Sequence, residues 1–388
     1  MTVTLCADRL SCQCQWWAPG GAQKFVSGLL AAAPLEPFLH DGAAIVDLRS
    51  PDDASATYLA GACSIPAALL TELLLELPPR GVPFHVLHDG GEPCLGALGK
   101  LLRLSIAADI RSVIDVVSGP FFSSVPPARL LRGAWPLSAR ARLWRPGPLA
   151  ALLGERAREW AALPPDAPLA VLDLGAGTGR NAVHLAERCG PASLVVAVDN
   201  RRVLCSRMAR FAGREVGARG GRVACVGWGE AQPPRAGGEH GAPPVAPGAA
   251  GALFAVCADA EELIARLAAE RGQPGRLEGA AAGGLPTAFD VVLFARFLHR
   301  GALAASTAAL RDRGGLVCAE TFRAGEAVDL PRDNLLAAGE LREVCERGLR
   351  GGARSGWDCR TLYEGESATE DGRALHSSVV WAGPRADA

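Results

Sequence analysis

Lysine is almost missing from this chain of 388 residues, because only Lys24 and Lys100 are lysines among 40 lysine and arginine residues. We interpret this first as the result of GC-rich codon usage. With 41 acidic residues the formal net charge is −1, so no overall positive field is present to attract nucleic acid or an anionic membrane. No basic face with interleaved aromatic residues is visible either, and a nucleic-acid partner has no support.

Several sequence signals are also absent. No stretch approaches the roughly 18 apolar residues that a membrane span needs, and the chain does not open with the basic and then apolar segments of a secretory signal. The twelve cysteines include no CxxC pair, so structural zinc is not indicated and no metal site is predicted. Together these absences predict a cytoplasmic protein in a reducing compartment, without a membrane partner.

The most informative segment that is present covers residues 169–180, Leu-Ala-Val-Leu-Asp-Leu-Gly-Ala-Gly-Thr-Gly-Arg. An apolar run ends at Asp173, and a helical pattern begins at residue 181. Between them stand three glycines at alternate positions, Gly175, Gly177 and Gly179. This pattern predicts a strand, a tight turn and a helix N-terminus, where glycines leave backbone N–H groups accessible to a ligand. A second apolar run, 194–198, ends at Asp199, which is placed to accept hydrogen bonds from ribose hydroxyls.

The segment from Asp173 to Gly179 resembles motif I of the class I S-adenosylmethionine-dependent methyltransferases, whose glycine loop has the form (D/E)xGxGxG. NAD-binding proteins usually carry GxGxxG instead. The resemblance implies a Rossmann-like α/β domain with a mostly parallel seven-stranded sheet. It also implies S-adenosylmethionine as the cofactor, with the glycine backbone against its methionine part. The implied cofactor-binding residues are Asp173, Gly175, Ala176, Gly177, Thr178, Gly179, Asp199, Asn200, Asp259 and Ala260.

The third strand of this domain has two candidates, residues 222–226 and residues 253–257, because a segment rich in glycine and proline separates them. The second candidate is followed by Asp259. In the methyltransferase family an Asp after the third strand often accepts the adenine amino group. An Asp at this position would equally serve as the N-cap of a helix over 260–269, and both roles stay open.

Further strands are expected at 289–294 and 315–319, followed by an antiparallel hairpin of 357–363 and 375–382. The string Arg-Phe-Leu-His-Arg at 296–300 and the segment Glu-Thr-Phe at 320–322 resemble methyltransferases of the tellurite-resistance type, and substrate residues are expected around both. Arg296 and His299 are the candidate catalytic residues, to orient a substrate anion or take a proton. Their alternatives are a cation at a helix start and a packed imidazole. A soft sulfur, selenium or tellurium acceptor would need no strong base.

Residues 43–66 are similar to the opening of rhodanese domains, although Tyr58 stands where those domains have His. A sulfurtransferase needs a thiolate at the start of the loop after its fourth strand. At that position this chain has His88 or Asp89, and Cys94 comes several residues later. We therefore expect a rhodanese-like domain that lacks the catalytic cysteine and serves as a scaffold or binds a protein partner.

The predicted organisation is a rhodanese-like α/β domain at 35–125, a linker at 126–148 and a methyltransferase domain at 149–384, with flexible insertions near 229–251 and 272–287. The leading hypothesis is an S-adenosylmethionine-dependent methyltransferase that acts on a small-molecule acceptor. Two alternatives stay open. The first is sulfurtransferase activity in the N-terminal domain, and the second is a non-catalytic regulator that binds the cofactor.

Overall fold

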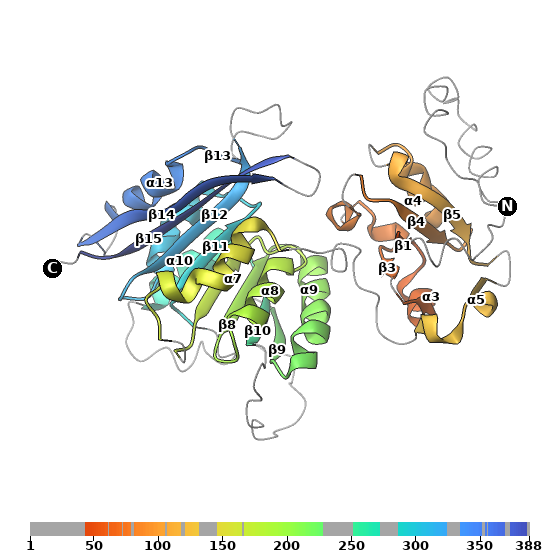
Figure 1. The fold of residues 1–388 in the computed structure, drawn as a ribbon, viewed down its shortest axis with the longest axis horizontal. Helices are drawn as coiled ribbons and strands as arrows, with labels where there is room; N and C mark the ends of the chain where they lie inside the picture. Colours follow the sequence, from red (N-terminus) through yellow and green to blue (C-terminus); the bar gives the residue numbers. More distant parts are fainter. Residues whose placement is uncertain are drawn as a thin grey trace. The chain divides into compact units, whose positions relative to one another are not determined.

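The computed structural model divides the chain into two compact units, Met1–Arg145 and Pro146–Ala388, each with its own sheet (Figure 1). It describes residues 43–60, 62–71, 73–78, 81–104, 107–117, 121–131, 146–164, 167–227, 251–271, 286–323, 334–350, 354, 356–368 and 373–385. The predicted insertions near 229–251 and 272–287 lie almost wholly outside these residues, as does most of the predicted linker. The domain bounds 35–125, 126–148 and 149–384 stay predictions.

The first unit contains a parallel four-stranded sheet in the order β3-β1-β4-β5. Its elements are β1 Ala44–Asp47, α3 Pro51–Ala56, β2 Tyr58–Leu59, β3 Ala62–Ser64, β4 Phe84–His88, α4 Glu92–Leu101, β5 Ile110–Asp115, α5 Phe121–Ser124 and β6 Leu130–Leu131. Between β3 and β4 the described residues form no α-helix. Two short 3-10 turns, Ala67–Leu69 and Leu74–Glu76, form there, and neither has a capping side chain among the described residues.

The second unit contains a mixed sheet of nine strands, in the order β14-β15-β12-β11-β7-β8-β10-β9 with β13 beside β12. The strands are β7 Ala170–Leu174, β8 Leu194–Asp199, β9 Val223–Gly227, β10 Ala252–Cys257, β11 Val291–Ala295, β12 Gly315–Arg323, β13 Leu335–Leu336, β14 Trp357–Ala368 and β15 Ala374–Pro384. Strands β7 to β13 pair in parallel, whereas β15 and β14 are antiparallel. The sheet has nine strands where seven were expected. Both candidates for the third strand join the sheet side by side, and the short strand β13 pairs with β12.

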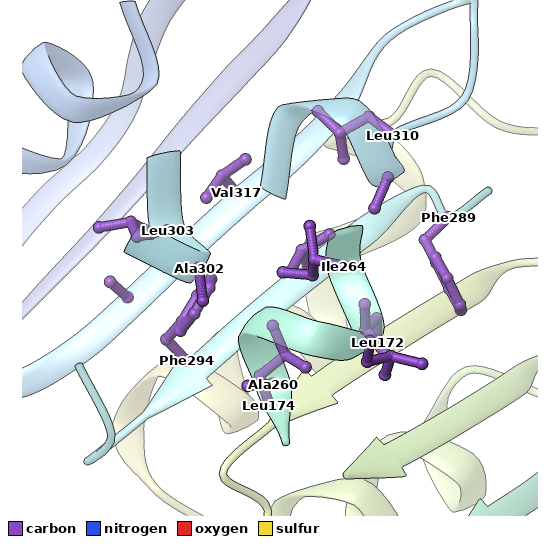
Figure 2. Packing of buried hydrophobic residues seen from close by; sticks show 14 of the residues in the cluster. Leu172, Leu174, Ala260, Ile264, Phe289, Phe294, Ala302, Leu303, Leu310 and Val317 are labelled. Atoms are coloured by element: carbon purple, nitrogen blue, oxygen red, sulfur yellow. The ribbon is translucent and has the colours of Figure 1, made fainter. Parts of the chain in front are cut away.

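Helices cover both faces of this sheet (Figure 1). They are α7 Pro148–Trp160, α8 Arg180–Arg188, α9 Arg202–Glu215, α10 Ala260–Arg271, α12 Arg300–Ala305 and α13 Glu340–Arg350. A large apolar core packs β7, β11 and β12 against α10, α12 and α13, and its members include Leu172, Ile264, Phe294, Leu303 and Val317 (Figure 2). In contrast, α7 packs against β11, β12 and β15, and α8 packs against β8. Along one strand, alternate residues point to opposite faces, so Asp173 and Glu320 lie on the face away from this core.

Strand β7 is anchored at its start by Asp290, which is fully buried. The Ala170 amide donates to Asp290 Oδ2 at 2.9 Å, and Arg311 lies 3.1 Å from the same oxygen. A buried carboxylate with these partners holds the strand that leads into the glycine turn. In the described parts of the chain, no helix has both the length and the apolar character needed to cross a membrane.

Candidate functional site

The glycine turn after β7 lies at the carboxyl edge of the parallel strands, where ligands of open α/β sheets bind. Gly175 and Gly177 have φ of 69° and 60°, a left-handed conformation that costs other residues free energy. A Cβ on Gly175 would lie 2.3 Å from Phe297 Cγ, so this position has no room for a side chain. A Cβ on Gly177 would meet no protein atom within 4 Å. A ligand can therefore approach the Cα of Gly177 from this side.

Several amides of this turn are already hydrogen-bonded within the protein. Ala176 N–H donates to Val198 O at 2.8 Å, and Gly179 N–H donates to Ala176 O at 2.9 Å. Gly177 N–H donates to Asp199 Oδ2 at 3.0 Å. These three N–H groups therefore serve to close the turn, which limits the expectation that the glycines leave backbone N–H groups accessible to a ligand. The half-buried Thr178 completes the turn.

Asp199 ends β8 and links it to the glycine turn. Its Oδ2 accepts the Gly177 amide, and its Oδ1 accepts the Arg201 amide at 2.9 Å. The carboxylate is 7% exposed, and Asn200 beside it is exposed. Each carboxylate oxygen has a second lone pair, so Asp199 can still accept a hydrogen bond from a ligand hydroxyl. The structure thus brings the predicted Asp199 to the predicted turn.

Asp173 is buried, and both of its carboxylate oxygens accept no hydrogen bond from the described residues. Burial, together with the nearby charge of Asp199, raises the pKa of Asp173 to about 8, although Arg180 acts in the opposite direction. A buried carboxyl group without a partner is costly. A ligand that brings a hydrogen-bond donor or a positive charge to Asp173 would remove this cost.

Asp259 serves as the N-cap of α10. Its Oδ1 accepts the amides of Glu261 at 2.9 Å and Glu262 at 3.1 Å. Cys257 pairs with Asp199 in the parallel register, so Asp259 and Ala260 follow the strand that ends next to β8. The Asp259 side chain is exposed and Ala260 is buried. The cap role is therefore present, and a role in binding adenine stays a prediction.

Arg296 and His299 follow β11 but differ in their setting. Arg296 has φ of 57°, which is unusual for a residue other than glycine, and its amide donates to Glu320 O at 2.6 Å. His299 caps the short helix α12, because its Nδ1 accepts the Ala302 amide at 3.2 Å. Its exposed ring places Nε2 at 3.5 Å from Glu261 Oε2. Only Nε2 is therefore available for proton exchange at His299.

The start of α7 also reaches this edge, which no sequence pattern indicated. The Leu149 amide donates to Glu320 Oε2 at 2.8 Å, and the Gly147 amide donates to Asn181 Oδ1 at 3.0 Å. These acceptors come from β12 and from the first turn of α8. The sequence placed Glu320 only in a segment expected to hold substrate residues, and its burial was not foreseen. Among the described residues, no three His, Cys, Asp or Glu side chains gather as a metal site.

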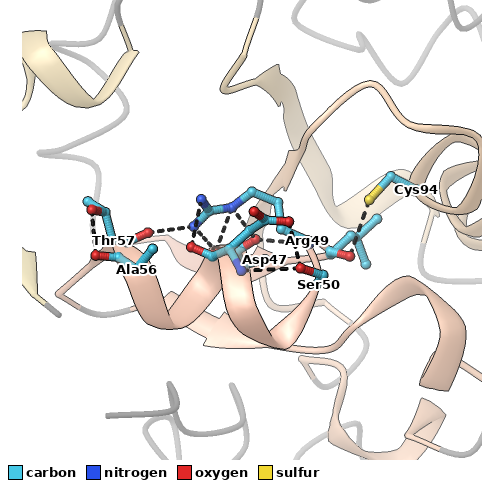
Figure 3. A network of polar contacts seen from close by, with 8 residues as sticks. Asp47, Arg49, Ser50, Ala56, Thr57 and Cys94 are labelled. Atoms are coloured by element: carbon cyan, nitrogen blue, oxygen red, sulfur yellow. Dashed lines mark hydrogen bonds and ion pairs between the residues drawn. The ribbon is translucent and has the colours of Figure 1, made fainter. Parts of the chain in front are cut away.

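In the first unit, the loop after β4 is closed by its own side chains. Gly90 N–H donates to His88 Nδ1 at 3.0 Å, and Gly91 N–H donates to Asp89 Oδ1 at 2.8 Å. Cys94 is buried in α4, and its thiol donates to Leu48 O at 3.2 Å (Figure 3). Burial raises the pKa of Cys94 to about 12. The cysteine is a protonated thiol near neutral pH, and these two amides are not available to an anion.

Next to this loop, a buried ion pair joins the end of β1 to the segment after α3. Arg49 Nη2 lies 2.7 Å from Asp47 Oδ2 and also donates to Thr57 O at 2.8 Å (Figure 3). The Arg49 guanidinium lies 4.8 Å from the ring centre of Phe122. Asp47 and Arg49 therefore form a structural link, in which both charges are paired.

No protein-family model matches the chain, and no curated protein matches it. Among solved structures, it is similar to the CurJ carbon methyltransferase, with 14% identity, a TM-score of 0.35 and coverage of 64% of this chain and 58% of that chain. A SAM-dependent methyltransferase from Agrobacterium tumefaciens has 16% identity and a TM-score of 0.34, with 66% of each chain covered. One from Aquifex aeolicus has 12% identity and a TM-score of 0.34, covering 62% of this chain and 95% of that chain.

The chain thus spans 58% and 66% of the length of the first two of these structures. At such identities and TM-scores, the function has to be inferred from the residues of the site itself.

Proposed function

We propose that the second unit is an S-adenosylmethionine-dependent methyltransferase that acts on a small-molecule acceptor. The observation that carries this proposal is Asp173, a buried carboxyl group at the end of the strand that enters the glycine turn, which has no hydrogen-bond partner among the described residues. The ammonium group of a methionine moiety would provide the missing donor and positive charge. The open space at Gly177 supports the same placement, because a ligand can lie against the main chain of the turn only where no side chain stands between them.

The other predicted residues are assigned by their position on neighbouring strands. Asp199 is proposed to accept the ribose hydroxyls, with Asn200 next to it. Asp259 and Ala260 are proposed to face the adenine, because the end of β10 lies next to the end of β8. When bound, S-adenosylmethionine would supply an electrophilic methyl group on a sulfonium. The protein then has mainly to align an acceptor and exclude water.

Arg296 and His299 are proposed to act on the acceptor side of the site. Arg296 lies at the end of β11, and its strained backbone is of the kind that clusters at functional sites. Its guanidinium would orient a polar acceptor, and His299 would exchange a proton through Nε2. A non-catalytic regulator would bind the cofactor but would not use Arg296 and His299 in a reaction. Detection of a methylated product therefore distinguishes a methyltransferase from such a regulator.

Calorimetry with S-adenosylhomocysteine tests the cofactor. We expect the wild type to bind it and Asp199→Ala to weaken binding about tenfold or more, the effect of losing a hydrogen bond to a charged group. Asp358→Ala, at an exposed position on β14, is the matched control and should bind as the wild type does. Absence of binding heat with both S-adenosylmethionine and S-adenosylhomocysteine would refute the proposal.

For the first unit we propose a rhodanese-like domain without sulfur transfer, which serves as a scaffold or binds a protein partner. The buried thiol of Cys94 and the internal bonds of the loop at His88–Gly91 argue against the sulfurtransferase alternative. A cytoplasmic location of the whole chain is part of the same proposal.

A further inference from the structure

Glu320 offers a second hydrogen-bond acceptor at the carboxyl edge, beyond those assigned to the cofactor. Its side chain is buried, and Oε2 is used by the Leu149 amide and, at 3.4 Å, by Ser377 Oγ. Oε1 is also buried and accepts no hydrogen bond from the described residues. The side chain is therefore fixed through Oε2, whereas Oε1 has no hydrogen-bond partner among the described residues.

The strand register places Glu320 at the same edge of the sheet as the proposed cofactor site, two strands away from the glycine turn. Glu320 pairs with Ala295, and β11 separates β12 from the glycine-turn strand β7. Two strand spacings amount to roughly 10 Å, and both acids lie near the carboxyl ends of their strands. Both acids lie on the face covered by α7 and α8. Arg296, proposed to orient the acceptor, is joined through its amide to the Glu320 carbonyl.

The chemistry of Oε1 limits what can bind there. A carboxylate oxygen attracts an N–H or O–H donor and repels a thiolate or an oxyanion. Burial raises the pKa of Glu320, and the Leu149 amide, Arg296 and Arg180 act in the opposite direction. Whether ionised or neutral, this carboxyl group can accept a hydrogen bond through its second oxygen.

We propose that Glu320 Oε1 binds the methyl acceptor, and that this acceptor presents an amine or hydroxyl group to it. The inference rests on the methyltransferase function proposed above and specifies its substrate class. It differs from the expectation of a soft sulfur, selenium or tellurium acceptor, for which an unpartnered buried carboxylate has no use.

Access to Oε1 is controlled by the start of α7. A Cβ on Gly147 would lie 2.7 Å from Oε1, so the main chain there covers the oxygen closely. The acceptor has to displace this segment, which is held by the bonds to Glu320 Oε2 and Asn181 Oδ1. Gly147→Ala keeps the Glu320 carboxyl group but places a methyl group in overlap with Oε1, so the two groups must shift apart and the methyl group blocks this oxygen. Its backbone φ of −55° is allowed for alanine.

The test uses the full chain saturated with S-adenosylhomocysteine and four probes that share one ring: benzylamine, benzyl alcohol, benzyl mercaptan and benzoate. Ligand-observed NMR measures their affinities for the wild type, Glu320→Gln and Gly147→Ala. Glu366→Gln is the matched control, because Glu366 is an exposed residue paired with Arg323 on the surface. We expect benzylamine or benzyl alcohol to bind the wild type at least about tenfold tighter than the other two probes.

Both variants at the site should lose this preference, and Glu366→Gln should keep it. Glutamine keeps an oxygen to accept the Leu149 amide, so the fold should persist. Preference for benzyl mercaptan or benzoate, unchanged affinities in both variants, or no binding of any probe would overturn the proposal. If S-adenosylhomocysteine itself does not bind, the proposed methyltransferase function fails instead. Mass spectrometry of products from a mixture of the four probes and S-adenosylmethionine is the second measurement, and methylation of the mercaptan alone would contradict the inference.

Discussion

The Leu149 amide donates a hydrogen bond of 2.8 Å to Glu320 Oε2, although 171 positions separate the two residues. The first N–H groups of a helix have no acceptor within the helix, and here a strand residue provides one for α7. The neighbouring Gly147 amide is satisfied in the same way by Asn181. Two side chains at the carboxyl edge therefore hold the N-terminus of the helix that precedes the glycine turn.

Asp173→Asn should raise the stability of the ligand-free protein and weaken binding of S-adenosylhomocysteine. The Asp173 carboxyl group ionises at pH about 8 in the folded state and near 3.8 when unfolded. Between these values the folded state holds the extra proton, so stability falls as pH rises, by up to about 1.4 kcal/mol per pH unit. The asparagine variant lacks this loss. In thermal unfolding, the difference in stability between Asp173→Asn and the wild type should therefore grow from pH 5 to pH 8.

Calorimetry at pH 7 provides the second half of this test, with about a tenfold loss of affinity expected in Asp173→Asn. Asp358→Asn, at an exposed site, should change neither stability nor affinity. A variant that binds as tightly as the wild type would contradict the role of Asp173 toward the methionine ammonium.

Gly175→Ala should destabilise the fold more than Gly177→Ala. Both substitutions place alanine at positive φ, which costs about 1–2 kcal/mol. Only at Gly175 does the new Cβ also overlap Phe297, which adds about 1–3 kcal/mol of overpacking. Urea unfolding measures both costs. Adding Phe297→Ala should offset part of the loss in Gly175→Ala and none of the loss in Gly177→Ala, and equal effects in the two backgrounds would refute this assignment.

Cys94 should be inert in the folded protein. A thiol with a pKa of about 12 has roughly one part in ten thousand as thiolate at pH 8. Iodoacetamide should therefore modify the Cys94 peptide far more slowly in the native protein than in urea, as followed by mass spectrometry. No turnover of thiosulfate and cyanide is expected, and turnover that disappears in Cys94→Ser would restore the sulfurtransferase alternative.

His299→Ala should lower stability by about 1 kcal/mol, because α12 loses the side chain that accepts the Ala302 amide. His299→Asn should keep most of that stability, since asparagine caps helices well. Thermal unfolding of the two variants measures the cap. If Nε2 also exchanges a proton, His299→Asn should fold normally and still lose methyl transfer, whereas full activity would limit His299 to its structural role.

The local elements were readable from the sequence because near neighbours encode them. The apolar run that ends at Asp173, the alternate glycines and the second run that ends at Asp199 predicted a strand, a turn and a second strand, and all three form. Short-range rules also allowed Asp259 to cap α10, which it does. The mixed α/β class with a mostly parallel sheet follows from the same alternation of strands and helices.

Partners and burial were decided only by the tertiary structure. Both candidates for the third strand lie in the sheet because β10 forms between β8 and β9, and no local pattern specifies that order. Asp173 is buried without a hydrogen-bond partner among the described residues, and Glu320 accepts the amide of Leu149, which lies far away in the sequence. Periodicity and turn chemistry depend on residues a few positions apart, whereas desolvation and hydrogen-bond pairing depend on which distant segments pack together.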